Sequence, residues 1–358
     1  MKPISGRLIY NEARRVFRDL NAFVRIQTPW PDAPDHVFRE GYVPIIVKGP
    51  KAGSFKNHVL NISIDAPGHY ELDGSEEKFV IHVDDMGKFC RSWMYSDLSH
   101  PPLNPHLRLT LTFRDPYTPE YEEKRIPRAL QQKLLSSFWQ VKNLRDVVVE
   151  GDPKPYPTLV KEMREAMDVP HRSPEKCLLE ATELKDKGNK LLTSGNYAGA
   201  LELYRQAWLA MHVVIVGHER HIHGEAFFNR QLTEPPWKDQ HGGNVRLTLR
   251  IILVANTVLA YLNMENWAEA KFWGMRTIKI MRTSLGLSEE DGGNPEEEAM
   301  TSFPAAATLG KIYYRTALAW KGLDDKSEAR RLLRVAAIYL PNDEKVQQEI
   351  AACALRLG

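Results

Sequence analysis

The sequence predicts an α/β domain over residues 1–170, followed by an all-α domain over residues 171–358 built from three helix-pair repeats and a C-terminal capping helix. In the first half apolar residues alternate with polar ones, which is typical of half-buried strands. Beyond residue 171 the strand patterns end and apolar residues follow helical spacing. The length of 358 residues is that of two or three domains.

Four segments of the first half have strand patterns. Residues 60–64 and 107–113 alternate apolar and polar side chains, and residues 79–83 and 147–149 are short runs rich in β-branched residues. Between the strands at 107–113 and 147–149, residues 127–141 predict an amphipathic helix with a proline in its first turn. Strands that alternate with helices favour an α/β layer with some parallel pairing.

Two more helices are predicted in this half, over residues 8–24 and 157–167. The half carries no residue pattern of recognisable chemistry, so we expect it to bind a protein partner of unknown identity. The boundary with the second half is predicted at residues 169–176. There Ser173 and Pro174 have the pattern of a helix N-cap and first helical position.

Charge and cysteine content narrow the class of protein. Lys plus Arg number 48 and Asp plus Glu 46, a formal net charge of +2, so no nucleic-acid partner is expected. The cysteines Cys90, Cys177 and Cys353 are odd in number and widely spaced. They therefore fit neither a disulfide framework nor a zinc site, and they indicate a reducing compartment.

We expect no targeting segment and no membrane partner. Residues 1–20 mix Arg with Glu and Asp and lack the apolar stretch of a secretory signal. The most apolar stretch, residues 247–262, is interrupted by Arg250 and Asn256, which disfavours a membrane span. The expected location is the cytoplasm, with the nucleus as a second compartment.

The second half repeats a helix pair of about 34 residues, the length of a tetratricopeptide repeat (TPR). Small residues recur at fixed places, Gly188 and Ala200 in the first unit and Ala317 and Ala329 in the third, where they let two antiparallel helices approach closely. The second unit is looser. The predicted units are about 181–212, 251–282 and 310–341, with a capping helix at about 343–357 and insertions at 213–244 and 282–304.

Five polar residues occupy the first helices of the three units. Lys185 and Asn189 are four residues apart and share a helix face, as do Lys311 and Arg315, and Asn256 lies on the first helix of the second unit. First helices line the concave surface of a TPR array, so the five side chains are expected to converge on one groove. Three cations and two amides without a facing acid form a receptor for carboxylates.

These five positions resemble the dicarboxylate clamp of TPR co-chaperones, and the stretch ELKDKGNKLLTSGNYAGALELY is similar to the usual first helix pair of that family. The resemblance covers about residues 175–358. It implies that the groove binds the C-terminal EEVD tail of heat-shock chaperones of the seventy- and ninety-kilodalton classes. It also implies that Lys185, Asn189, Asn256, Lys311 and Arg315 grip the terminal carboxylate and the last aspartate side chain.

Two other function classes remain open at this stage. The chain could be a ubiquitin-ligase adaptor or general scaffold whose groove binds an internal peptide, or the α/β half could hold an enzyme site in a deep pocket lined by perturbed acids or histidines. No phosphate-binding loop and no motif of a zinc protease or serine hydrolase is present. We therefore expect no catalytic residues, no metal and no cofactor.

Two weaker signals are interpreted as exposed loops. One is the acidic stretch at residues 288–298, which contains a Gly-Gly pair and a proline. The other is a histidine cluster in the first insertion, for which a solvated loop is favoured over a zinc site. Its members are His218, His221, His223 and His241.

Overall fold

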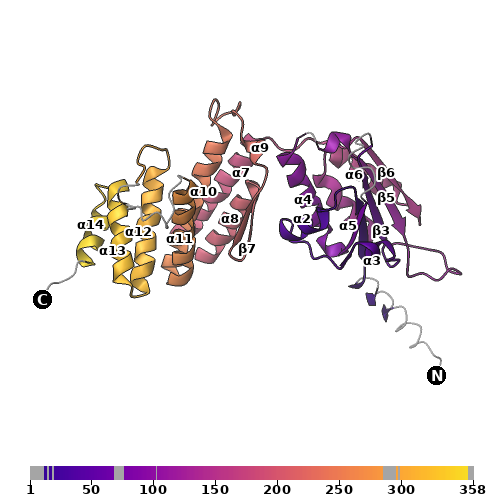
Figure 1. Cartoon of the computed structure of the whole chain (residues 1–358), viewed down its shortest axis with the longest axis horizontal. Helices are drawn as coiled ribbons and strands as arrows, with labels where there is room; N and C mark the ends of the chain where they lie inside the picture. The colour runs from indigo at the N-terminus through magenta and orange to yellow at the C-terminus, as the bar shows by residue number, and fades with distance from the viewer. Residues whose placement is uncertain are drawn as a thin grey trace, which may run out of the picture. The chain divides into compact units, whose positions relative to one another are not determined.

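The computed structural model describes residues 12–13, 16–17, 20–67, 76–101, 103–284, 296 and 299–353. The chain divides into two compact units, residues 1–171 and residues 172–358 (Figure 1). The first is an α/β unit and the second is helical, so the predicted fold class is confirmed.

The first unit is built on a six-stranded mixed sheet of order β2-β4-β1-β3-β5-β6. Strand β1 pairs parallel with β3, and β5 pairs parallel with β6, while the remaining neighbours are antiparallel. The strands are β1 (Phe23–Thr28), β2 (Val47–Lys48), β3 (Leu60–Asp65), β4 (Glu77–His82), β5 (Arg108–Arg114) and β6 (Asp146–Asp152).

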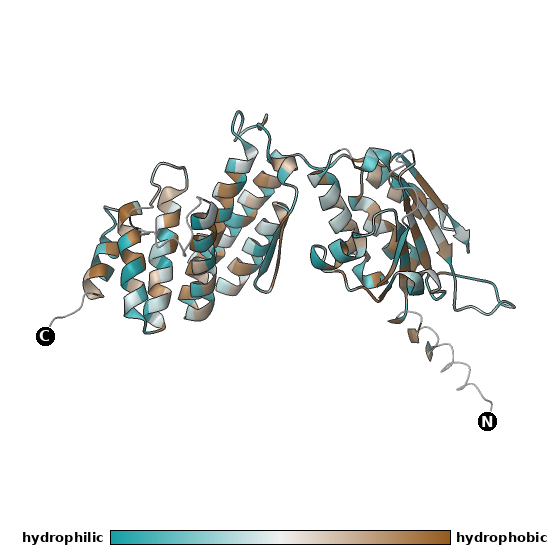
Figure 2. Ribbon diagram, viewed as in Figure 1, coloured by the Kyte–Doolittle hydropathy of each residue, from teal (hydrophilic) through white to brown (hydrophobic). Residues whose placement is uncertain are grey.

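Alternating side chains give this sheet one apolar face. Ile26, Ile62 and Leu111 are fully buried on neighbouring strands, while the polar residues between them lie nearer the surface. Figure 2 shows the apolar residues gathered along the strands. Helices and a 3₁₀ turn complete the core, namely α2 (Ala33–Arg39), α3 (Pro50–Gly53), α4 (Met86–Ser99), α5 (Arg128–Ser136), the turn Ser137–Gln140 and α6 (Pro157–Asp168).

The helix predicted over residues 8–24 is wrong at its end. Residues 23–24 begin β1, because Val24 and Ile26 alternate with Arg25 and Gln27 in the period of a strand. Much of residues 8–19 lies outside the described residues. The helix predicted over 127–141 ends as an α-helix at Ser136 and continues as a 3₁₀ turn.

The second unit contains three antiparallel helix pairs and a final helix. Ser173 caps the first helix as predicted, since its side chain accepts a hydrogen bond from the Lys176 amide. Asn196 and Asp325 cap the second helices of the first and third pairs in the same way. The helices are α7 (Pro174–Thr193), α8 (Tyr197–Ala210), α10 (Gly242–Asn263), α11 (Trp267–Ser284), α12 (Ala306–Gly322), α13 (Lys326–Tyr339) and α14 (Glu344–Ala352).

Two glycines allow helices of this unit to approach closely. A Cβ on Gly188 would lie 2.5 Å from the ring of Tyr204, so glycine at this place lets α7 pack on α8. A Cβ on Gly274 would lie 1.9 Å from Thr316 Oγ1, so here the glycine of α11 accommodates a side chain of α12. This second contact explains why the second unit has glycine where the first unit has an aromatic ring.

The first insertion is folded and is not the solvated loop that was expected. It forms a two-stranded antiparallel hairpin, β7 (Val213–Val216) and β8 (Glu219–Ile222), followed by the short helix α9 (Glu225–Phe228). The ring of His218 stacks on Phe272 with centroids 3.8 Å apart, and its Nε2 lies 2.9 Å from Glu269 Oε1. The described residues contain no group of three or more His, Cys, Asp or Glu side chains that could hold a metal ion.

Helix α10 corrects one expectation from the sequence. Among the helices that the structure describes, it alone is long and apolar enough to cross a membrane by length and composition, despite Arg250 and Asn256. Its apolar stretch is 56% buried inside the unit, where α10 packs against α7, α8, α11 and α12. Its apolar character is therefore that of a core helix. The acidic stretch at 288–298 lies outside the described residues, except for Glu296.

Candidate functional site

The five predicted groove residues lie on the first helices of the three helix pairs. Helix α7 carries Lys185 and Asn189, α10 carries Asn256, and α12 carries Lys311 and Arg315. Because α10 packs against both α7 and α12, it forms the centre of a three-helix surface. Hydrogen bonds from each side of α10 bring residues of this surface together.

The two asparagines are in direct contact. Asn256 Nδ2 donates to Asn189 Oδ1 at 2.8 Å, and the hydroxyl of Tyr204 on α8 donates to the same oxygen at 2.9 Å. Both lone pairs of Asn189 Oδ1 are therefore occupied. Its Nδ2 group has no acceptor among the described residues, so it remains available as a donor to a ligand.

Arg315 is held on the other side of α10. Its Nη1 donates to the backbone carbonyl of Ala255, the residue before Asn256. Burial lowers the pKa of Arg315, while nearby Tyr204 and Tyr314 act in the opposite direction. The guanidinium forms no ion pair with any carboxylate in the described part of the chain. It is a partly buried cation with a backbone carbonyl as its hydrogen-bond partner, and it would gain from a carboxylate ligand.

Tyr204 links the two halves of this arrangement. Its side chain is buried, and burial raises the pKa of its hydroxyl to about 12, with Arg315 as a smaller opposing influence. The hydroxyl therefore stays protonated at neutral pH and acts as a donor to Asn189. Tyr204 is not among the five site residues predicted from the sequence. The sequence signal for its hydrogen bond is a tyrosine at a position where phenylalanine would pack equally well.

The three cations differ in their surroundings. Lys311 is exposed and has no hydrogen-bond or ion-pair partner among the described residues. The side chain of Lys185 is only 15% exposed, and its Nζ lies 3.0 Å from Asp186 Oδ1. Arg315 is less exposed than Lys311, because its side chain reaches the backbone of α10.

The groove also contains one acid that was not expected. Asp186 follows Lys185 in sequence, and its side chain is 57% exposed, so the pair is screened by water. A carboxylate ligand could displace this weak contact. The five predicted residues and Asp186 together carry three positive charges and one negative charge.

Among the described residues, no hydrogen bond, ion pair or ring contact joins the hairpin of the first insertion to the five groove residues. Its partners are Trp208 on α8, over whose ring Arg220 lies at 5.4 Å, and residues of α11. At its base the buried Arg246 of α10 donates to the carbonyls of Met211 and His223. Elsewhere in the first insertion, the amide of Thr233 donates to Glu175 Oε1 near the start of α7 at 2.9 Å. Most of residues 282–298 lies outside the described residues.

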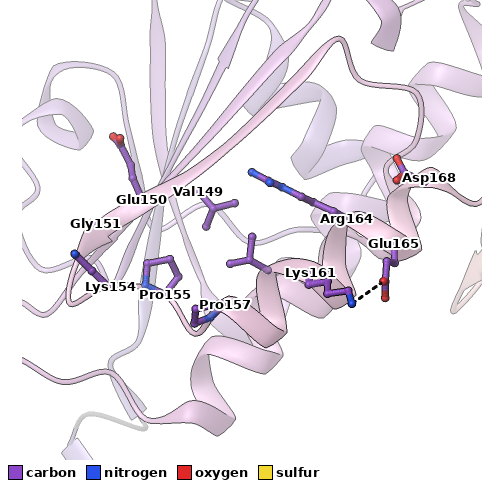
Figure 3. A pocket seen from close by; sticks show the side chains of 11 residues that line it. Val149, Glu150, Gly151, Lys154, Pro155, Pro157, Lys161, Arg164, Glu165 and Asp168 are labelled. Atoms are coloured by element: carbon purple, nitrogen blue, oxygen red, sulfur yellow. Dashed lines mark ion pairs between the residues drawn. The ribbon is translucent and has the colours of Figure 1, made fainter.

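A second concave surface lies on the first unit, between β6 and α6. It encloses about 650 Å³, and Figure 3 shows Arg164 of α6 reaching toward the strand. Arg164 donates to the Val147 carbonyl at 3.1 Å, and Lys161 pairs with Glu165 at 3.7 Å. Three cations and three acids are mixed along this lining, so no single charge dominates it. It therefore offers weaker complementarity to a charged ligand than the groove does.

No protein-family model matches the chain. Two solved structures are similar to about half of it. One is the first TPR domain of Spaghetti (RPAP3) bound to the HSP90 peptide SRMEEVD, with 16% identity over 49% of this chain and 90% of that chain, and a TM-score of 0.30. The other is the C-terminal TPR-containing domain of a Plasmodium falciparum FK506-binding protein. It has 16% identity over 51% of this chain and 91% of that chain, and a TM-score of 0.32.

Proposed function

We propose that the helical unit binds the free C-terminus of an acidic peptide, and that the ligand is the EEVD tail of heat-shock chaperones of the seventy- or ninety-kilodalton class. The whole chain then acts as a non-enzymatic cytoplasmic adaptor, with the α/β unit binding a second protein. The observation that carries this proposal is the guanidinium of Arg315. It is partly buried with no carboxylate partner among the residues the structure describes, and two asparagines in mutual contact lie on the helices α7 and α10.

Each groove residue has a distinct part in this proposal. The amide of Asn189 is oriented by Tyr204 and Asn256, so its Nδ2 group donates to the terminal carboxylate. Lys185 adds positive charge one helical turn away. On α12, Arg315 and Lys311 lie one turn apart and bind the side-chain carboxylate of the last residue. Two separate sets of donors thus match the two carboxylates of a C-terminal aspartate.

The expected affinity is modest. A short tail loses conformational entropy when it becomes ordered, so a dissociation constant of about 1 µM, or about 8 kcal/mol, is expected. Lys311 is exposed to solvent, and its attraction to the ligand is therefore screened by salt. The affinity should fall as ionic strength rises.

A matched pair of lysine variants tests the proposal without disturbing the fold. Lys311→Ala removes an exposed cation with no partner in the described residues, whereas Lys187→Ala removes an exposed cation on α7 outside the groove set. Titration calorimetry with an EEVD peptide should show a loss of at least fivefold for the first and little change for the second. Equal affinities of the two variants would contradict the assignment.

Asn189→Asp gives a sharper test of the amide. The replacement keeps an oxygen that accepts from Tyr204 and Asn256, but it removes the Nδ2 donor and adds a negative charge. Stability should change little, while peptide affinity should fall at least tenfold. Unchanged affinity in a folded Asn189→Asp protein would show that this amide does not face the ligand.

A further inference from the structure

A cavity of about 450 Å³ lies in the α/β unit, apart from the peptide groove. Its floor is the apolar face of the sheet, with Ile26 from β1, Ile64 from β3 and Phe79 from β4, and its wall includes Phe89 and Trp93 of α4. All five of these side chains are buried. The volume falls within the range of about 300–1,000 Å³ that is usual for small-molecule sites.

The cavity exists because small side chains occupy the positions that would otherwise fill it. Ser92 and Ser96 lie one turn apart on α4 and line the cavity, and Ala33 lines it from α2. Protein interiors are normally packed to a density that leaves few voids larger than a water molecule. Three small residues on two facing helices are therefore a specific feature of this core.

Several polar groups of the lining lie on α2 and α4, and the buried Thr28 adds a hydroxyl from β1. Ser96 Oγ donates to the Ser92 carbonyl at 3.1 Å and lies 3.3 Å from Nε2 of His36. His36 and His100 line the cavity and are exposed, so they mark its opening to solvent. A ligand that enters here meets the two histidines at the opening and a mainly apolar interior with the hydroxyls of Thr28 and Ser92.

The lining also limits the charge of the ligand. Among the described residues that form it there is no Lys and no Arg, and the one acid, Asp32, is exposed. A buried carboxylate or phosphate would lack a counter-charge, and its desolvation would not be compensated. The lining therefore disfavours nucleotides and fatty-acid anions and favours an uncharged molecule.

We propose that this cavity binds a small, uncharged, largely aromatic or aliphatic molecule that carries one hydrogen-bonding group near Ser96 and His36. Phe79, Phe89 and Trp93 contact its apolar body. The site is independent of the peptide groove, since the residues that line it all belong to the first unit.

Two dyes of similar shape and different charge test the proposal on the full chain. N-phenyl-1-naphthylamine is uncharged, and 1-anilinonaphthalene-8-sulfonate has the same ring framework with a sulfonate. The uncharged dye should bind saturably with one site, and the sulfonated dye at least tenfold more weakly. Absence of saturable binding by the uncharged dye, or equal binding of the two dyes, would overturn the proposal.

Filling the cavity from either wall should abolish dye binding. Ala33→Phe and Ser96→Phe add a ring from α2 and α4, whereas Arg39→Phe adds the same ring at an exposed position of α2 outside the lining. The first two should weaken binding of the uncharged dye at least tenfold, and the third should not. Unchanged binding by the two filled variants would place the dye elsewhere.

Hydrogen exchange supplies a measurement that needs no variant. Saturation with the uncharged dye should slow amide exchange in α2 and α4 of the wild-type chain and leave α7 and α12 unchanged. Slower exchange only in the helical unit would contradict the proposal, even if a filled variant failed to fold.

Discussion

Gly188→Ala tests the connection between helix packing and the groove. Gly188 lies on α7, next to Asn189, and an added Cβ would lie 2.5 Å from Cε1 and 2.9 Å from Cδ1 of Tyr204. These distances are too short for carbon atoms in contact, and Tyr204 is buried, so its ring has little room to move. The two helices must therefore separate or the ring must turn.

The expected loss of stability follows from two opposing contributions. Alanine in place of a helical glycine favours folding by about 1 kcal/mol. Overpacking of a core typically costs about 1–3 kcal/mol, and the tight contact at Gly188 puts this site at the upper end. The net effect is a loss of about 1–2 kcal/mol. If Tyr204 moves, its hydrogen bond to Asn189 weakens, and peptide affinity should fall about two- to tenfold.

Hydrogen exchange measured by mass spectrometry reports the opening free energy of α7 and α8 separately from the first unit. Gly87→Ala in α4 is the control, because an added Cβ there would have nothing within 4 Å. The control should be neutral or slightly stabilising in its own unit. A Gly188→Ala protein with unchanged exchange in α7 and α8 and normal peptide affinity would refute the packing argument.

Three further predictions concern other parts of the chain. Burial lowers the pKa of His58 to about 4 from its usual 6.5. The free energy of unfolding should therefore decrease by about 3 kcal/mol as pH falls from 6.5 to 4. In His58→Gln, urea denaturation should show most of this pH dependence to be lost. Arg246→Leu removes the side chain that donates to the carbonyls of Met211 and His223. The free energy of unfolding of the second unit should therefore fall by about 2–4 kcal/mol, and limited proteolysis should cut the hairpin more readily. Burial raises the pKa of Cys177 to about 11, so this thiol should react with a disulfide reagent only after unfolding in urea, and rapid reaction of the native chain would contradict its burial.

The fold could be predicted where the period of apolar residues is regular. The strands β3 and β5 and the helix pairs follow directly from spacings of two and about 3.6 residues. The hairpin of residues 213–222 was missed because its histidines and charged residues resemble a solvated loop. They form strands because one side packs on α8 and α11, a tertiary contact that no local pattern reveals.

The site could be predicted by position but not by environment. Spacing predicted the helices that carry all five residues, and the structure brings Asn189 on α7 into contact with Asn256 on α10. The partial burial of Arg315 depends on the backbone of α10, and the contact of Lys185 with Asp186 depends on side-chain conformation. Neither can be inferred from sequence spacing. The groove residues thus remain a prediction as ligands, although their surroundings are now defined.

The most direct test of the account uses one acidic peptide ending in EEVD in two forms, with a free C-terminal carboxylate and with a C-terminal amide. The carboxylate clamp predicts binding of the free form near 1 µM in titration calorimetry, and a loss of at least tenfold on amidation, because one of the two carboxylates is removed. Equal binding of both forms would contradict the clamp and favour a groove that binds internal peptides. Binding of neither form would contradict the proposed ligand.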